Sequence, residues 1–129
     1  MNRQIVIIED DRDILDMIQL ILADEGYDVI GFAGLQGVEK IIEHQPSVIL
    51  LDNRLGDGYG NTFCATLKSN PGTKHIPVIL VSASGDLASI AKKCNADGYL
   101  PKPFDLDDLI KIVKQFSSAS ETYYDVTPD

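Results

Sequence analysis

Residues 47–60 read SVILLDNRLGDGYG and form the part of the chain that decides the fold. The apolar run Val48–Leu51 predicts a short strand buried on both faces, as in a parallel sheet covered by helices. Asp52 follows at the carboxyl end of this strand, where open α/β sheets bind their ligands. A loop with glycines at positions 56, 58 and 60 comes next. Aspartate before such a loop can also be a simple turn residue, so the role of Asp52 depends on the rest of the chain.

The composition indicates one globular domain. The chain has 129 residues, of which 44% are hydrophobic and 24% charged, which is enough to bury a core without disulfides. Its two cysteines, Cys64 and Cys94, lack CxxC spacing, which argues against a zinc site and indicates a reducing compartment. The apolar run Ile5–Ile8 is too short for a signal peptide or a membrane span. We therefore expect a cytoplasmic location and no membrane partner.

The charge balance is acidic. Twenty acidic and 11 basic residues give a net charge of −9. Binding of a phosphate backbone requires a basic face, and no stretch of the sequence supplies one. We therefore expect no direct nucleic-acid binding by this chain.

Apolar runs and helical patterns alternate along the chain. The expected strands are 5–8, 27–33, 48–51, 77–81 and 98–101, and the helices between and after them lie near 14–22, 35–42, 61–69, 87–94 and 106–116. Five such alternations predict an α/β fold, a doubly wound five-stranded parallel sheet of flavodoxin-like order 2-1-3-4-5 with helices on both faces. Pro101 places the last strand at a sheet edge. Residues 117–129 are polar and aperiodic and are expected to form a tail.

The predicted topology brings polar residues together at one edge of the sheet. In this strand order the first and third strands are neighbours, so Glu9 and Asp10 should lie beside Asp52. Ser82 and Lys102 end the fourth and fifth strands at the same edge. Three carboxylates in one cleft suit Mg²⁺, which prefers hard oxygen ligands. An ammonium group nearby suits a transferred phosphoryl group, whose oxygens require positive partners.

With these residues in place, the chain resembles the receiver domain of two-component response regulators, of the kind found in the chemotaxis regulator. The resemblance covers residues 4–116, and the receiver domain is expected to take in 1–116. It rests on four motifs in order, IIEDD (7–11), LLD (50–52), VILVSA (78–83) and YLPKPF (99–104). Each motif alone is weak, whereas the four together at compatible spacing are specific.

The resemblance implies a role for each residue of the cleft. Asp52 would accept a phosphoryl group from a sensor histidine kinase or a histidine phosphotransfer protein, and an unknown downstream protein or domain would read the result. The cofactor would be Mg²⁺, held by Asp10, by Glu9 directly or through water, by Asp52, and by the main-chain carbonyl of Arg54.

Three further residues would serve the reaction and the switch. Lys102 would pair with the phosphoryl group, and Ser82 would be the hydroxyl that moves towards it. Tyr99 would turn inward once Ser82 has moved. The resemblance also implies a cis peptide bond between Lys102 and Pro103. From the residues alone, Ser82 could instead simply satisfy a backbone group at a strand end, and Tyr99 could be a static surface aromatic.

The sequence departs from the family pattern in three places. Gly56 stands where a proline is usual, which loosens the turn, and Asp57 beside it is expected to serve the turn. Lys102 follows Ser82 by 20 positions, a shorter interval than is usual in the family, so the region 84–94 is expected to be shortened. Arg54 and Ser84 occupy positions that modulate the lifetime of the phosphoryl group in the family.

Other functions remain open at this stage. A degenerate receiver used only for binding is disfavoured because the acidic residues, the acceptor and the lysine are all present. An aspartate-nucleophile phosphohydrolase would need a second aspartate two residues after Asp52, where Arg54 stands. A flavin carrier is disfavoured because carboxylates at the end of the first strand repel a phosphate. We therefore expect a signalling domain and not an enzyme, beyond self-catalysed phosphorylation and dephosphorylation.

Overall fold

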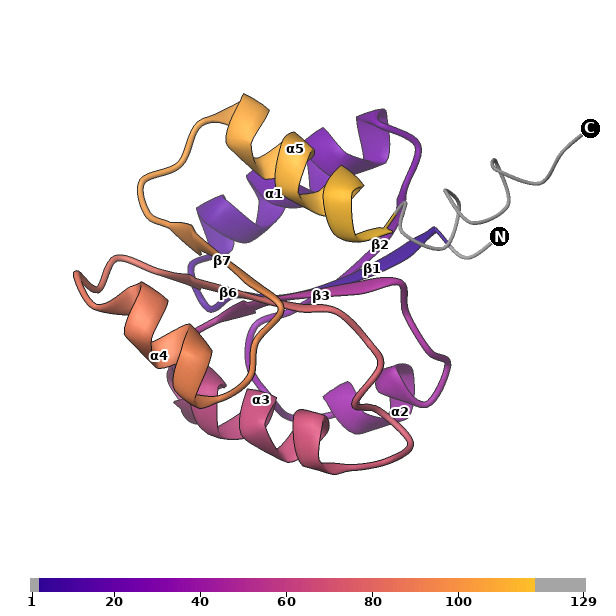
Figure 1. The fold of residues 1–129 in the computed structure, drawn as a ribbon. Coiled ribbons are helices and arrows are strands. Elements are labelled where there is room, and N and C mark those ends of the chain that lie inside the picture. The colour runs from indigo at the N-terminus through magenta and orange to yellow at the C-terminus, as the bar shows by residue number, and fades with distance from the viewer. Residues whose placement is uncertain (1–2, 118–129) are drawn as a thin grey trace, which may run out of the picture.

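A parallel five-stranded sheet forms the centre of the molecule in the computed structural model, which describes residues 3–117 (Figure 1). The strand order is β2-β1-β3-β6-β7, and every pairing is parallel. Because β6 and β7 are the fourth and fifth strands of this sheet along the chain, this is the predicted 2-1-3-4-5 order of the flavodoxin-like fold. The strands are β1 (Gln4–Ile8), β2 (Asp28–Phe32), β3 (Val48–Asp52), β6 (Val78–Ser82) and β7 (Gly98–Pro101).

Helices cover both faces of the sheet, as predicted. They are α1 (Arg12–Asp24), α2 (Val38–Ile42), α3 (Gly60–Ser69), α4 (Leu87–Lys93) and α5 (Leu106–Ser117). Helices α1 and α5 pack on one face, and α2, α3 and α4 pack on the other (Figure 1). Each face therefore has its own hydrophobic core. Among residues 3–117, none of the helices combines the length and the apolar composition needed to cross a bilayer.

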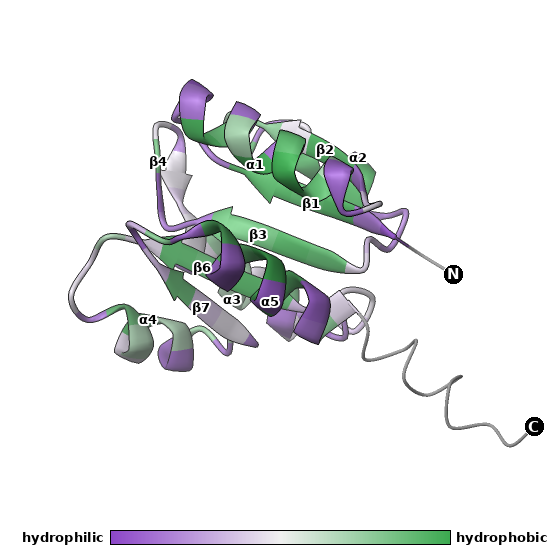
Figure 2. Ribbon diagram, turned by 90° about the horizontal axis from the view of Figure 1, so that it is seen from above, coloured by the Kyte–Doolittle hydropathy of each residue, from purple (hydrophilic) through white to green (hydrophobic). Residues whose placement is uncertain are grey.

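The central strand β3 is buried along its whole length. Its apolar residues alternate between the two cores, with Val48 and Leu50 on the side of α1 and α5 and Ile49 and Leu51 on the other. Figure 2 shows β3 as a hydrophobic strand between helices of mixed colour. A continuous apolar run is the expected pattern for a strand covered on both faces. The prediction that β2 and the proline-containing β7 lie at the edges is confirmed.

The segment after Asp52 differs from the prediction. The sequence pattern predicts a loop, whereas the structure has a small antiparallel hairpin of β4 (Arg54–Leu55) and β5 (Gly58–Tyr59). Such short strands do not show in a sequence pattern, and the glycines suggest only a turn. This hairpin carries the chain from the end of β3 to the start of α3.

The last helix ends one residue later than predicted. Ser117 was expected to begin the tail, but it belongs to α5, is buried, and lies 3.0 Å through its hydroxyl from the hydroxyl of Tyr27. A contact across 90 positions cannot be inferred from local polarity, so this prediction was wrong. The remainder of the predicted tail, 118–129, lies outside the described residues.

Candidate functional site

The strand registers bring the predicted site residues to one edge of the sheet. Ile8 pairs with Leu51 across β1 and β3, so Glu9 and Asp52 leave the sheet side by side. Ser82 pairs with Pro101 across β6 and β7. The backbone N–H of Lys102 then donates to the carbonyl of Ser82 over 2.9 Å. The predicted convergence at the carboxyl ends of the strands is therefore present.

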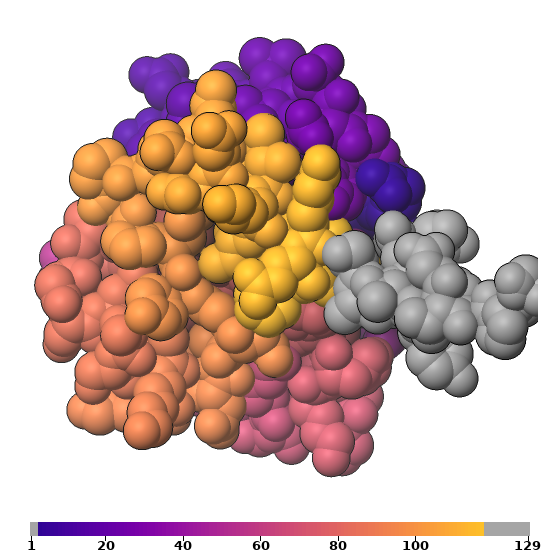
Figure 3. Space-filling model, turned by 45° about the horizontal axis from the view of Figure 1, so that its top comes forward, coloured from indigo at the N-terminus to yellow at the C-terminus, as the bar shows by residue number. Residues whose placement is uncertain are grey.

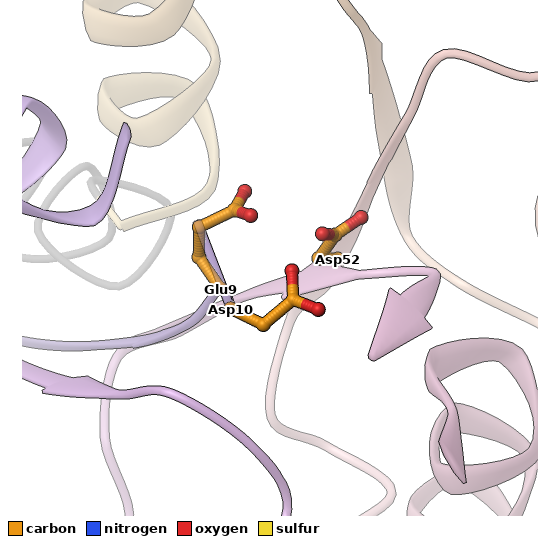
Figure 4. A group of neighbouring side chains, drawn as sticks. All are labelled: Glu9, Asp10 and Asp52. Atoms are coloured by element: carbon orange, nitrogen blue, oxygen red, sulfur yellow. The ribbon is translucent and has the colours of Figure 1, made fainter. Parts of the chain in front are cut away.

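Three carboxylates form the centre of the site. One oxygen each of Glu9, Asp10 and Asp52 lies within 4.8 Å of the others. Figure 4 shows the three side chains converging from the ends of two strands. Glu9 and Asp52 are buried, with 2% and 6% exposed, whereas Asp10 is exposed. Crowded carboxylates that are open to solvent on one side suit a hard divalent cation that keeps several waters, so this cluster could hold a metal ion.

Lys102 supplies a positive charge to the cluster. Its Nζ lies 2.9 Å from Oε1 of Glu9 and 3.4 Å from Oδ2 of Asp52. Burial lowers the pKa of Lys102, but the two carboxylates outweigh it and raise that pKa above the usual value. Burial also raises the pKa of Glu9, and its bonds to Lys102 and to the backbone of Asp11 act in the opposite direction. Lys102 is therefore firmly cationic in the apo site.

Asp11 connects the cluster to the first helix. Its backbone N–H donates to Oε2 of Glu9 over 3.1 Å. Its own carboxylate accepts from the N–H groups of Asp13 and Ile14 at 3.0 and 3.2 Å. Asp11 is thus the N-cap of α1. Because the same residue caps the helix and contacts Glu9, the start of α1 is tied to the position of the Glu9 carboxylate.

An open cavity of about 340 Å³ adjoins Asp52. Arg54, Ser82, Ser84 and Lys102 line it together with Asp52 and Ala83. The hydroxyl oxygen of Ser82 accepts from the N–H of Ser84 over 3.1 Å, which leaves its proton available to a ligand in the cavity. The cavity thus presents the carboxylate of Asp52 beside hydrogen-bond donors and a cation.

Tyr99 lies apart from this cleft. It is 45% exposed, does not line the cavity, and sits in β7 opposite Leu80 of β6. The peptide bond between Lys102 and Pro103 is cis, as the resemblance implies. The structure therefore brings together Lys102, Ser82 and the three carboxylates, and leaves Tyr99 at the surface.

Asn53 is a site residue that the sequence analysis missed. It is 7% exposed, and its side-chain oxygen accepts from the N–H of Asn61 in the first turn of α3 over 2.9 Å. Its carbonyl accepts from the N–H of Gly60 over 2.8 Å. A Cβ on Gly60 would lie 2.3 Å from the carbonyl oxygen of Asp52, so only glycine allows this close approach. No sequence signal distinguishes this asparagine from an ordinary loop residue.

Comparison with known proteins now decides the family. The profile described as the response regulator receiver domain matches residues 5–114. The chain belongs to the response regulator receiver domain family. It is a signalling domain of two-component systems, and the four motifs that carried the resemblance were read correctly.

A curated relative and two solved structures illustrate the similarity. The chain is 34% identical over 114 residues to the DNA-binding dual master transcriptional regulator RpaA of Synechocystis, an alignment that covers 86% of this chain and 47% of the relative. A protein assigned as a response regulator from Chloroflexus aurantiacus superposes with a TM-score of 0.82 at 28% identity, covering 92% of this chain and 99% of that one.

The second structure is the receiver domain of the sensor histidine kinase PA1611 from Pseudomonas aeruginosa, which contains a magnesium ion coordinated in its active-site cleft. Its TM-score is 0.78 at 24% identity, covering 92% of this chain and all of that one, and this likeness shows the fold. The chain spans about half the length of the curated relatives it matches. Receiver domains thus occur here both in DNA-binding regulators and in a histidine kinase.

Proposed function

We propose that Asp52 accepts a phosphoryl group from the phosphohistidine of a sensor histidine kinase or a histidine phosphotransfer protein. The observation that carries the proposal is the position of its carboxylate. Asp52 ends the buried central strand, borders the cavity, and lies beside Glu9, Asp10 and Lys102. Among the carboxylates of residues 3–117, Asp52 is the one that combines all of these features. Family membership supports the same role.

We propose that the cofactor is Mg²⁺, with Glu9, Asp10, Asp52 and the carbonyl of Arg54 as its protein ligands. The backbone of β4 supports the last of these. The N–H of Arg54 points at Oδ1 of Asp52, at 3.5 Å. The N–H of Gly60 donates to the carbonyl of Asn53, so the next pair, Arg54 and Tyr59, exchanges no ladder bonds. Both backbone groups of Arg54 therefore face away from β5, and the N–H is directed at Asp52. When bound, Mg²⁺ would neutralise charge on the phosphoryl oxygens.

The chain's own residues account for the transfer step. A carboxylate oxygen of Asp52 attacks the phosphorus, the new P–O bond forms as the P–N bond breaks, and the electron pair leaves with the imidazole nitrogen. Lys102, already within 3.4 Å of Asp52, pairs with the oxygens of the transferred group. The hydroxyl of Ser82 donates to another of these oxygens. Preorganised cations and donors of this kind account for most of the catalysis in phosphoryl transfer.

We propose that phosphorylation changes a partner-binding face built from α4, β7 and α5. These elements form one continuous surface, seen in Figure 3, and β7 contacts both helices. Movement of Ser82 towards the phosphoryl group would let the exposed Tyr99 turn inward. The downstream protein or domain would read this face. Helix α4 has only seven residues, in keeping with the shortened region expected from the sequence.

We further propose that the domain is a phosphoryl acceptor located in the cytoplasm. It is not an enzyme beyond self-catalysed phosphorylation and dephosphorylation. A phosphohydrolase would need an aspartate as acid and base two residues after Asp52. Arg54 occupies that position. A binding-only receiver would not need the intact cleft of Lys102, Ser82 and the three carboxylates. Both cysteines are buried and unpaired, which agrees with a reducing compartment.

Mass spectrometry after incubation with Mg²⁺ and acetyl phosphate tests the proposal. We expect one phosphoryl addition that requires Mg²⁺ and disappears in Asp52→Asn. Asp28→Asn, at the start of the edge strand β2 and outside the cluster, is the matched control and should be phosphorylated normally. A mass gain that persists undiminished in Asp52→Asn would refute the assignment of the acceptor.

A further inference from the structure

Asp57 joins the hairpin after Asp52 to a distant loop. Its two carboxylate oxygens accept from the backbone N–H of Leu35 at 2.9 and 3.2 Å. Asp57 lies at the tip of the β4–β5 hairpin, and Leu35 lies between β2 and α2. The contact therefore spans 22 positions and fixes the tip of the hairpin to a separate part of the fold. A charged acceptor makes this a stronger bond than one between neutral groups.

The chain is shaped to admit this contact. A Cβ on Gly34 would lie 2.8 Å from Oδ2 of Asp57 and 2.9 Å from Oδ1. Any larger residue at position 34 would therefore push the carboxylate away from Leu35. The side chain of Leu35 is anchored in turn, since it packs against the core on the side of α2, α3 and α4. The N–H that donates to Asp57 thus belongs to a residue whose side chain is held by the core.

At its tip the hairpin is met by the side chain of Leu35 as well, whose Cδ1 lies 3.1 Å from the place of a Cβ on Gly58. Gly56 precedes Asp57 and has no neighbouring atom within 4 Å of the place of a Cβ, and it stands where the family usually has a proline. Leu55 packs against the core, and Asn53 holds the base of the hairpin through Gly60. Glycine gives the turn more freedom than proline would. The tip is therefore the end of the hairpin that needs an anchor.

We propose that Asp57 is a positioning residue for the metal and acceptor site, acting through the backbone of Arg54. By holding the tip of the hairpin on Leu35, it keeps β4 where the backbone groups of Arg54 face away from β5 and its N–H is directed at Asp52. Asp57 thereby supplies the rigidity that the missing proline would give. This inference rests on the proposed Mg²⁺ site. It goes beyond the turn role expected for Asp57, because a turn residue alone would not alter metal affinity.

Three variants separate the bond from the charge. Asp57→Ala removes both the bond and one negative charge. Asp57→Asn removes the charge but keeps an oxygen that accepts from Leu35. Gly34→Ala keeps the charge and displaces the carboxylate. Each protein is titrated with Mg²⁺ while the backbone amide shifts of Asp10 and Arg54 are followed, and hydrogen exchange at the Leu35 amide is measured in chelator.

We expect Asp57→Ala and Gly34→Ala to raise the Mg²⁺ dissociation constant by roughly threefold to tenfold, the equivalent of one hydrogen bond. Leu35 exchange should speed up in both, and Asp57→Asn should stay near the wild type. The double variant Asp57→Ala/Gly34→Ala should bind Mg²⁺ no more weakly than either single variant, because both substitutions remove the same contact. At saturating Mg²⁺ the phosphorylation rate of these variants should return to that of the wild type. The reason is that the variants lower only the fraction of molecules whose hairpin is positioned to bind Mg²⁺.

Several outcomes would overturn the proposal. If Asp57→Asn binds Mg²⁺ as weakly as Asp57→Ala while Gly34→Ala binds normally, the effect is one of charge and not of position. If the dissociation constant is unchanged in all three, Asp57 has a structural role only. If the rate stays low at saturating Mg²⁺, Asp57 acts on the acceptor chemistry and not through metal binding. Failure of the wild type itself to bind Mg²⁺ would instead refute the proposed metal site.

Discussion

The ammonium nitrogen of Lys102 lies closer to Glu9, at 2.9 Å, than to the proposed acceptor Asp52, at 3.4 Å. The Lys102 side chain is 19% exposed and that of Glu9 only 3%. The Glu9 carboxylate also accepts from the N–H of Asp11. Without a metal ion, Lys102 is thus the main charge that offsets three crowded carboxylates.

Replacing Lys102 by Met should therefore have two opposite effects. In chelator the free energy of unfolding should fall by about 1–3 kcal/mol, because Glu9 stays buried without its charged partner. Mg²⁺ should bind more tightly, because an ammonium group no longer repels the divalent cation. Urea unfolding in chelator and calorimetric titration with Mg²⁺ measure the two effects.

The matched control is Lys111→Met, which removes an exposed lysine of α5 outside the cleft. It should change neither quantity appreciably, since exposed charges contribute little. If Lys102→Met bound Mg²⁺ more weakly than the wild type, the ammonium group would be assisting metal binding and our account of the cluster would be wrong.

Asp10→Asn should remove most of the stabilisation that Mg²⁺ gives. A ligand at 100 times its dissociation constant stabilises the folded state by about 2.7 kcal/mol, and Asp10 is one of only three side-chain carboxylates in the cluster. In chelator the variant should be more stable than the wild type, because one repelling charge is gone. Thermal unfolding with and without Mg²⁺ measures both effects, with Asp16→Asn on the exposed side of α1 as control. Equal Mg²⁺ affinity in Asp10→Asn would place the metal elsewhere.

Most of the fold and the centre of the site could be predicted because they follow from local patterns. Continuous apolar runs identified the buried strands, and the alternation with helices indicated a parallel sheet, with right-handed crossovers narrowing the topology. Once β1 and β3 are neighbours, Glu9 and Asp52 must leave the sheet side by side, as the register of Ile8 with Leu51 shows. The position of each polar residue at a strand end then places it in the cleft.

The features that could not be predicted depend on contacts between distant segments. Asn53 accepts from the N–H of Asn61 in the first turn of α3, and Asp57 accepts from the N–H of Leu35. Both are polar residues in a glycine-rich segment, which as a pattern indicates only a turn. Ser117 is polar and next to the tail, but its bond to Tyr27 buries it in α5. None of these pairings has a signature in the residues that surround it.

Cys64 should be inert towards thiol reagents in the folded protein. Burial raises the pKa of its thiol, and the neighbouring Cys94 raises it further. A raised pKa keeps the thiol protonated at neutral pH, and the thiolate is the reactive form. Iodoacetamide should therefore modify Cys64 far more slowly in the native protein than in urea, both at pH 7 and at pH 9. Peptide mapping of samples treated with and without urea measures this. Native modification as rapid as that in urea would contradict the prediction.

The coupling of Ser82 to Tyr99 can be tested with beryllofluoride as a mimic of the phosphoryl group. Backbone amide shifts should concentrate at 52–60, 82–87 and 99–104, and fade along α4 towards Cys94. Ser82→Ala should suppress the shift of Tyr99 while the mimic remains bound. A ligand shifts a conformational equilibrium only through contacts that differ between the two states, and Ser82 carries the movable donor in the cavity.

The starting state of the two residues makes this test decisive. Ser82 is 6% exposed and borders the cavity, whereas Tyr99 is 45% exposed on the neighbouring strand. Any response of Tyr99 must therefore be relayed from the cavity, and the proposed relay is the hydroxyl of Ser82. Ser89→Ala on the exposed side of α4 is the control, and it should leave the shift of Tyr99 intact. If Tyr99 responds equally in Ser82→Ala, the aromatic ring is a bystander and the switch runs through other residues.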